Sequence, residues 1–145
     1  MLKRYTFWLT AGVLFQFLSA ILHSISFIVT PELHNETERQ IHSLITGYRE
    51  DMGAGFHRSF FDLFTAVSAC YPLLCLLGGL TLGYLLLKDA GLDLMRGTIL
   101  INVVIFGVCL LVMALFTFLP PILMTGLIFG NLLISYLLVP SAEEG

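Results

Sequence analysis

The sequence predicts an all-α integral membrane protein, a four-helix bundle with an extra amphipathic helix in the outer loop between the first two spans. Two observations support this fold class. The 145 residues are 57% hydrophobic and only 12% charged, whereas an average soluble domain carries roughly 25% charged residues. Four apolar runs each approach the roughly 20 residues that cross a hydrocarbon core of about 30 Å; they lie near 6–30, 60–87, 97–118 and 121–139. Because these runs use most of the chain, residues 1–145 are expected to form a single transmembrane domain.

Basic residues predict the orientation of the spans. Lys3 and Arg4 precede the first span, and Lys88 and Arg96 bracket the loop between the second and third spans. Cytoplasmic loops are enriched in Lys and Arg, so we expect this loop and both chain termini to face the cytoplasm. The loop at 31–59 has an acidic balance and is expected on the outer side.

The outer loop carries the signals of a helix over about 31–50. Thr30 and Pro31 are typical of an N-cap and a first helical position. Asn35 is an alternative start, since its side chain can cap a helix while Glu38 completes an arrangement like a capping box. From either start, apolar residues recur at the i, i+3, i+4, i+7 spacing of an amphipathic helix; they are Ile41, Leu44, Ile45 and Tyr48. This helix is expected either to lie on the outer leaflet or to cover the bundle.

Glycines and prolines predict how the spans pack. Pro72 has no N–H to bond the carbonyl of Ser68, so a kink is expected in the second span. Two pairs of glycines with GxxxG spacing predict close helix contacts; they are Gly79 with Gly83 and Gly126 with Gly130. The adjacent prolines 120 and 121 leave a very short connection, so the third and fourth spans are predicted to be antiparallel neighbours.

The polar positions His23, Arg58 and Asp62 form the first candidate site. His23 and Asp62 fall in the outer halves of the first and second spans, at depths that permit contact. Arg58 precedes Asp62 at the i, i+4 spacing of a helix. One interpretation is a polar pocket that opens outward and binds a ligand, relays protons or performs catalysis. The alternative is that Arg58 simply neutralises Asp62, while His23 bonds a backbone carbonyl or Ser26.

A second set of residues has the side chains of metal ligands. His34, Glu38 and His42 stand at successive i, i+4 positions. His34 and His42 would lie about 12 Å apart along the axis, too far to share one ion at about 2 Å from each nitrogen. Only neighbouring pairs can chelate, so a solvated helix face is the default interpretation. No metal or other cofactor is predicted.

The remaining polar residues of the spans are expected to have structural roles. Gln16, Asn102 and Asn131 are intramembrane amides that can join helices by hydrogen bonds. The three cysteines lie inside predicted spans and are expected to be small apolar fillers rather than disulfide partners.

Three short motifs resemble those of a known group of proteins. They are Met52-Gly53, the stretch Ser59-Phe60-Phe61-Asp62, and Gly78-Gly79. Their order over residues 20–87 resembles a family of small, uncharacterised four-span bacterial inner-membrane proteins. The resemblance implies an inner-membrane location and supplies no activity. It also marks Ser59 and Asp62 as positions to test.

The expected function is that of a non-enzymatic membrane protein. Phosphate loops, nucleophile elbows and HExxH or CxxC motifs are absent from the sequence, and a net charge of −3 gives no basis for nucleic-acid binding. The chain is expected to be an accessory subunit of a larger membrane complex or a small bundle that binds a ligand or lipid. Its partners would be the lipid bilayer and either that complex or further copies of the chain. The alternative is an enzyme or carrier that uses the pocket around His23, Arg58 and Asp62.

Overall fold

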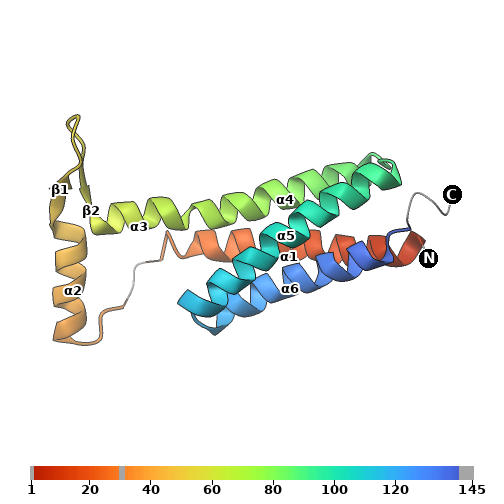
Figure 1. The fold of residues 1–145 in the computed structure, drawn as a ribbon. Helices are drawn as coiled ribbons and strands as arrows, with labels where there is room; N and C mark the ends of the chain where they lie inside the picture. The colour runs from red at the N-terminus through yellow and green to blue at the C-terminus, as the bar shows by residue number, and fades with distance from the viewer. Residues whose placement is uncertain (1, 30–31, 141–145) are drawn as a thin grey trace. The chain divides into compact units, whose positions relative to one another are not determined.

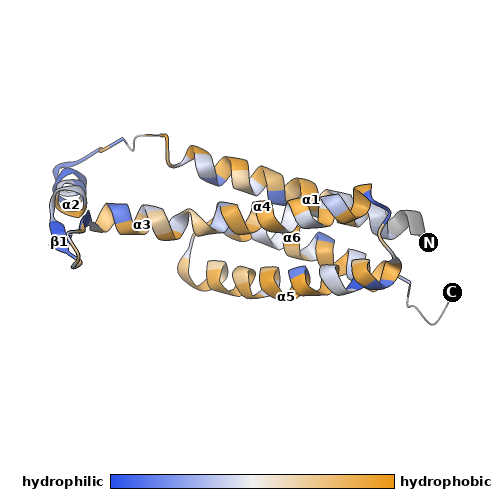
Figure 2. Ribbon diagram, turned by 90° about the horizontal axis from the view of Figure 1, so that it is seen from above, coloured by the Kyte–Doolittle hydropathy of each residue, from blue (hydrophilic) through white to orange (hydrophobic). Residues whose placement is uncertain are grey.

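The computed structural model describes residues 2–29 and 32–140. Within this part of the chain, four helical segments are long and apolar enough to cross a membrane, namely Tyr5–Ile25, Phe60–Leu87, Leu92–Phe116 and Leu119–Leu138. These segments consist mostly of hydrophobic residues, whereas hydrophilic residues are concentrated around residues 36–51 (Figure 2). The prediction of a mostly helical chain with four apolar spans is confirmed.

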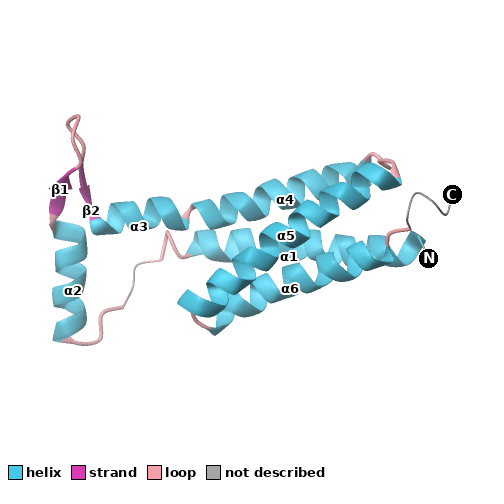
Figure 3. Ribbon diagram, in the orientation of Figure 1, coloured by secondary structure: helices cyan, strands magenta, loops and turns pink. Residues whose placement is uncertain are grey.

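Eight elements follow one another along the chain (Figure 3). They are α1 (Leu2–Ile25), α2 (Glu36–Gly47), β1 (Arg49–Asp51), β2 (His57–Ser59), α3 (Phe60–Ser68), α4 (Cys70–Leu87), α5 (Leu92–Phe116) and α6 (Leu119–Leu138). The chain divides into two compact units. The inner unit comprises residues 1–20 and 74–145, and the outer unit comprises residues 21–73.

The helices do not begin and end where the apolar runs of the sequence do. One reason is that polar residues at the end of a run can belong to the helix. The third span begins at Leu92 rather than near 97, because Asp93 stands in the first turn, where the helix dipole favours an acid. The fourth begins at Leu119, with both prolines in its first turn, where a missing N–H breaks no helical bond. The first ends at Ile25, and tighter bonds such as Ser26 N–H to the carbonyl of His23 (3.1 Å) follow it.

The second span is divided, as Pro72 predicted. Helix α3 ends at Ser68 and α4 begins at Cys70, with Ala69 between them. Proline cannot donate to the carbonyl four residues earlier, which belongs to Ser68. The bond from the N–H of Leu73 to the carbonyl of Ala69 is stretched to 3.4 Å. The interruption is therefore a local effect of the proline.

Helix α2 uses the second of the two predicted starts. The side chain of Asn35 accepts the N–H of Glu38 at 2.9 Å, and its amide donates to the Glu38 carboxylate at 2.8 Å. The same carboxylate accepts the N–H of His34 at 2.7 Å. The alternative start at Thr30 and Pro31 lies outside the described residues, and residues 32–35 are not helical.

A two-stranded ribbon replaces the end of the expected 31–50 helix. Strand β1 pairs antiparallel with β2, with Arg49 opposite Ser59 and Asp51 opposite His57. The turn between them holds Gly53, Ala54 and Gly55 at φ values of 82°, 51° and 82°. Glycine reaches this left-handed region at little cost. These two glycines therefore let the chain reverse direction between β1 and β2.

The inner unit is built on the hairpin of α5 and α6, which run side by side in antiparallel directions, as predicted from the two prolines (Figure 1). The hydroxyl of Ser135 on α6 donates to the carbonyl of Tyr5 on α1 at 3.1 Å. The large side chains that are buried include Leu9, Leu82, Ile99, Phe106, Ile128 and Leu132. All four helices that contribute to this unit therefore place apolar side chains in its interior.

Candidate functional site

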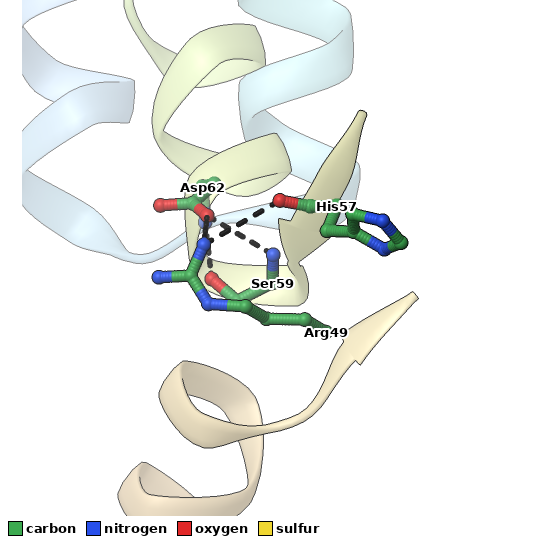
Figure 4. Close-up of polar contacts among 4 residues, drawn as sticks. All are labelled: Arg49, His57, Ser59 and Asp62. Atoms are coloured by element: carbon green, nitrogen blue, oxygen red, sulfur yellow. Dashed lines mark hydrogen bonds and ion pairs between the residues drawn. The ribbon is translucent and has the colours of Figure 1, made fainter. Parts of the chain in front are cut away.

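Ser59 and Asp62 form the capping box at the start of α3. The Ser59 hydroxyl accepts the N–H of Asp62 at 3.1 Å, and the Asp62 carboxylate accepts the N–H of Ser59 at 3.0 Å (Figure 4). Both bonds satisfy N–H groups that a helix start leaves without partners. The two residues that the family resemblance singled out thus have a clear structural role, which is to begin the second span.

Asp62 also faces a basic residue, and that residue is Arg49. The Nη1 atom of Arg49 lies 3.9 Å from the Asp62 carboxylate and donates to the carbonyl of His57 at 3.4 Å (Figure 4). Both side chains are largely exposed. No pattern in the sequence predicts this pair, because it depends on strand pairing that places Arg49 opposite Ser59.

The predicted i, i+4 spacing of Arg58 and Asp62 on a helix is wrong. Residues 57–59 form a strand, so Arg58 stands opposite Glu50 on the ribbon. Its guanidinium lies 5.6 Å from the centre of the Phe56 ring. Arg58 therefore belongs to the surface of the ribbon.

His23 has partners of its own within the outer unit. Its Nε2 atom lies 3.0 Å from the hydroxyl of Ser68. The imidazole makes edge-to-face contacts with Phe27 and Tyr71, at ring-centre distances of 5.4 and 5.3 Å. The Ser26 hydroxyl donates to the backbone carbonyl of His23, not to its ring.

The predicted contact between His23 and Asp62 is consequently wrong. Ser68, which bonds His23, follows Asp62 by six residues, or about 9 Å of helix rise. The sequence placed His23 and Asp62 at similar depths, but the carboxylate turns back to cap the first turn of α3. His23 bonds Ser68, while Asp62 caps α3 with Arg49 as its ion-pair partner and Arg58 as a further nearby charge. Nothing in this geometry prepares a nucleophile or an acid–base pair.

The possible metal ligands do not share one helical strip, because α2 begins at Glu36 and His34 precedes it. Both carboxylate oxygens of Glu38 accept hydrogen bonds at the helix start. The His42 ring lies 6.5 Å from the Phe61 ring in a tilted contact. Among the described residues, no group of three His, Cys, Asp or Glu side chains is placed to hold a metal ion.

The inner unit contains a buried polar cluster at mid-membrane, which we call the Gln16 cluster: Gln16, Ser19 and Asn102. Gln16 is fully buried and Ser19 is 3% exposed. Within residues 2–29 and 32–140, neither the Gln16 carboxamide nor the Ser19 hydroxyl has a hydrogen-bond partner. A Cβ on Gly78 would stand 2.6 Å from Gln16 Nε2 and 2.7 Å from Asn102 Oδ1. Gly78 therefore leaves the space that these two amides occupy.

The intramembrane asparagines bond within their own helices. Asn102 donates to the carbonyl of Thr98 at 3.0 Å, and Asn131 donates to the carbonyl of Leu127 at 2.7 Å. The expectation that these amides join helices through their donors is wrong. Their NH₂ groups reach the carbonyl one turn earlier, which is always available on the same helix.

Three of the four predicted packing glycines lie against a neighbouring helix, and three other glycines have closer neighbours. The shortest distances from a glycine's Cβ position to a neighbouring side chain are at Gly78, at Gly12 beside Leu132 (3.1 Å) and at Gly107 beside Phe129 (3.1 Å). Among the predicted glycines, Gly79 meets the Phe17 ring at 3.4 Å, and Gly83 and Gly126 each have a neighbour at 3.8 Å. For Gly130, nothing in the described part of the chain lies within 4 Å. The expected close contact at Gly130 is therefore not made by any of the described residues.

Comparison with models of protein families, with curated proteins and with solved structures gave no match. The function must therefore be argued from the surfaces and sites of the chain itself.

Proposed function

We propose that this protein is a non-enzymatic accessory subunit of a larger membrane complex, and that residues 32–59, here called the outer segment, contact its partner. The observation that supports this is the exposure of apolar side chains outside the four spans. Tyr48 is 71% exposed and Phe56 is 56% exposed. Ile41, Leu44 and Met52 are exposed as well. These positions lie outside the four candidate spans, so a protein partner that covers them would remove them from water.

The outer segment has an ordered framework on which such a surface can be presented. Asn35 caps α2, the ribbon pairs β1 with β2, and the capping box of Ser59 and Asp62 joins the ribbon to α3. Arg49 adds the ion pair to Asp62. A preformed surface loses less conformational entropy on binding than a flexible loop does.

The charge of the outer segment favours a protein over a lipid surface. It holds five acidic residues against three basic ones; they are Glu32, Glu36, Glu38, Glu50 and Asp51 against Arg39, Arg49 and Arg58. Segments that bind anionic membranes are rich in Lys and Arg instead. An acidic surface with exposed aromatic side chains suits a protein partner with a basic rim.

The proposed arrangement in the cell follows the basic residues of the spans. The four helices would form a bundle in a bacterial inner membrane, with both termini and the loop of Lys88 in the cytoplasm. The outer segment, including the amphipathic α2, would lie on the opposite side. Cysteine labelling at Ser43 from outside, in a variant without the native cysteines, tests this orientation; protection of Ser43 with labelling at Gly91 would reverse it.

Site-specific photo-crosslinking in the native membrane tests the accessory role. A benzophenone amino acid replaces Tyr48 in one variant and Phe56 in a second. The matched control replaces Arg39, a polar and exposed residue of α2 within the same outer segment. We expect the same protein adduct from the first two positions and none from the control. The substitution Tyr48→Glu should also abolish the adduct formed at position 56.

Two results would contradict the proposal. Adducts with lipid alone at both positions would show that the outer segment lies on the membrane surface. An adduct with a second copy of the chain would show a homo-oligomer in place of a larger complex.

A further inference from the structure

A cavity of about 440 Å³ lies at the end of the inner unit where spans one, two and three begin or end. Tyr5 and Thr6 line it from α1, Leu86 from the last turn of α4, and Met95 from the first turns of α5. Asp89 and Ala90 complete the lining from the loop between α4 and α5. The volume falls within the roughly 300–1,000 Å³ of small-molecule sites.

The position of this cavity places it at the membrane surface. Tyr5 is the first residue of the first apolar span, Leu87 is the last of the second, and Leu92 is the first of the third. The cavity lies among these three ends, where lipid headgroups meet the protein. Its ligand is therefore expected to carry a polar group and an apolar stem.

The lining specifies the charge of the ligand. Asp89 supplies a carboxylate, Tyr5 a phenol and Thr6 a hydroxyl, while Leu86, Ala90 and Met95 are apolar. Of the side chains that the structure describes, none that lines the cavity belongs to Lys or Arg. In the described part of the chain, no basic side chain lies within 4.0 Å of the Asp89 carboxylate. An acid in such a site is matched by a cation, and the ring of Tyr5 adds a favourable face for one.

We propose that this cavity binds a primary ammonium group, such as the headgroup of phosphatidylethanolamine. Three N–H donors match the carboxylate, phenol and hydroxyl oxygens that line the site. A trimethylammonium group has the same charge but no N–H donor, so the site discriminates against choline lipids.

Two basic residues next to the cavity suit the phosphate of the same headgroup. Lys88 precedes Asp89 and lies 6.0 Å from the centre of the Tyr84 ring. Arg96 follows Met95 and lies 5.4 Å from the centre of the Tyr136 ring. A zwitterionic headgroup with its ammonium at Asp89 therefore has cations within reach of its phosphate. The site contains none of the outer-segment residues and is therefore independent of the proposed accessory role.

Lipid binding to the purified, delipidated full chain tests this site. Native mass spectrometry compares phosphatidylethanolamine with phosphatidylcholine and phosphatidylglycerol of the same acyl chains. We expect a preference for phosphatidylethanolamine of roughly tenfold or more, the size of one hydrogen-bonded charge pair. Asp89→Asn keeps the shape of the side chain and should remove the preference. The matched control is Asp93→Asn, an exposed acid on the first turn of α5 that does not line the cavity.

A second variant and a soluble amine complete the test. Tyr5→Phe removes the phenol oxygen without opening space and should weaken the preference severalfold. Binding of ethanolamine alone that is lost in Asp89→Asn would assign the site to a free amine. Failure of millimolar ethanolamine to displace the lipid would assign it to the headgroup. Equal binding of the ethanolamine and choline lipids, or an equal loss in Asp89→Asn and Asp93→Asn, would overturn the proposal.

Discussion

The substitution Gly78→Ala should weaken the inner unit, because Gly78 makes room for two buried amides. The new Cβ would stand 2.6 Å from Gln16 Nε2 and 2.7 Å from Asn102 Oδ1. These distances are well inside van der Waals contact, so at least one amide must move. Gln16 is fully buried, and its carboxamide has little free volume to move into.

The size of the effect follows from two opposing contributions. Overpacking of a filled interior costs about 1–3 kcal/mol, while replacing glycine by alanine inside a helix gains about 1 kcal/mol. Gly130→Ala is the matched control, since no described atom lies within 4 Å of its Cβ position. Both variants share the gain in helix propensity. The unfolding free energy of Gly78→Ala should therefore be about 1–3 kcal/mol lower than that of Gly130→Ala, and this difference is the steric cost alone.

The difference in unfolding free energy can be measured by reversible unfolding of the full chain in bicelles, followed by steric trapping or SDS titration. A second substitution, Gln16→Ala, removes the amide that the new Cβ meets. It should therefore restore part of the stability lost in Gly78→Ala, as a negative coupling in a double-mutant cycle. If Gly78→Ala unfolds at the same midpoint as Gly130→Ala, the close approach of Gln16 and Asn102 to α4 is refuted.

Four further substitutions test the hydrogen bonds, or their absence at Gln16, described above. Gln16→Leu should leave the unfolding free energy unchanged or raise it, because an unpaired buried amide costs about 1–3 kcal/mol; a clear loss would show that Gln16 bonds another helix. Asn35→Ala should destabilise α2 by about 1 kcal/mol, seen as faster amide hydrogen exchange in its first turn; unchanged exchange there would contradict the cap. Ser68→Ala should change the imidazole nitrogen shifts of His23 while Asp62→Asn should not, and the reverse pattern would reinstate the contact between His23 and Asp62.

The spans and the helix starts were predictable because each depends on a short stretch of sequence. A window of about 20 apolar residues suffices to identify a span, and proline acts on the residue four positions earlier wherever it occurs. Asn35 with Glu38, and Ser59 with Asp62, are capping pairs whose partners are three residues apart. In each case, the interacting groups are neighbours in the chain.

The ribbon was not predictable by the same rules. Each strand has only three residues, and five of the six are exposed, so no alternation of polar and apolar residues marks them. The helical spacing of Arg58 and Asp62 assumed one helix on both sides of Ser59, whereas residues 57–59 form a strand and Ser59 caps α3. For the same reason, the ion pair of Asp62 was expected with Arg58, whereas it is formed with Arg49.

The packing glycines show a related limit of sequence reasoning. A GxxxG pattern states that two small residues share a face, but not which helix that face meets. Gly78, Gly12 and Gly107 have the closest neighbours, and none of them belongs to the two predicted pairs. Their contacts depend on the side chains opposite, which are Gln16, Leu132 and Phe129.

Most polar side chains inside or beside the spans form hydrogen bonds with nearby backbone groups. These bonds restrict where a ligand can bind. Asp62 caps α3, while Asn102 and Asn131 donate to their own helices. If one of these carboxylates or amides turned toward a ligand, its hydrogen bond to the backbone would be lost. Asp89 differs, because it faces a cavity at the membrane surface and no basic side chain in the described ranges pairs with it. Recognition of a charged ligand is therefore expected at Asp89 rather than at the polar positions of the outer half.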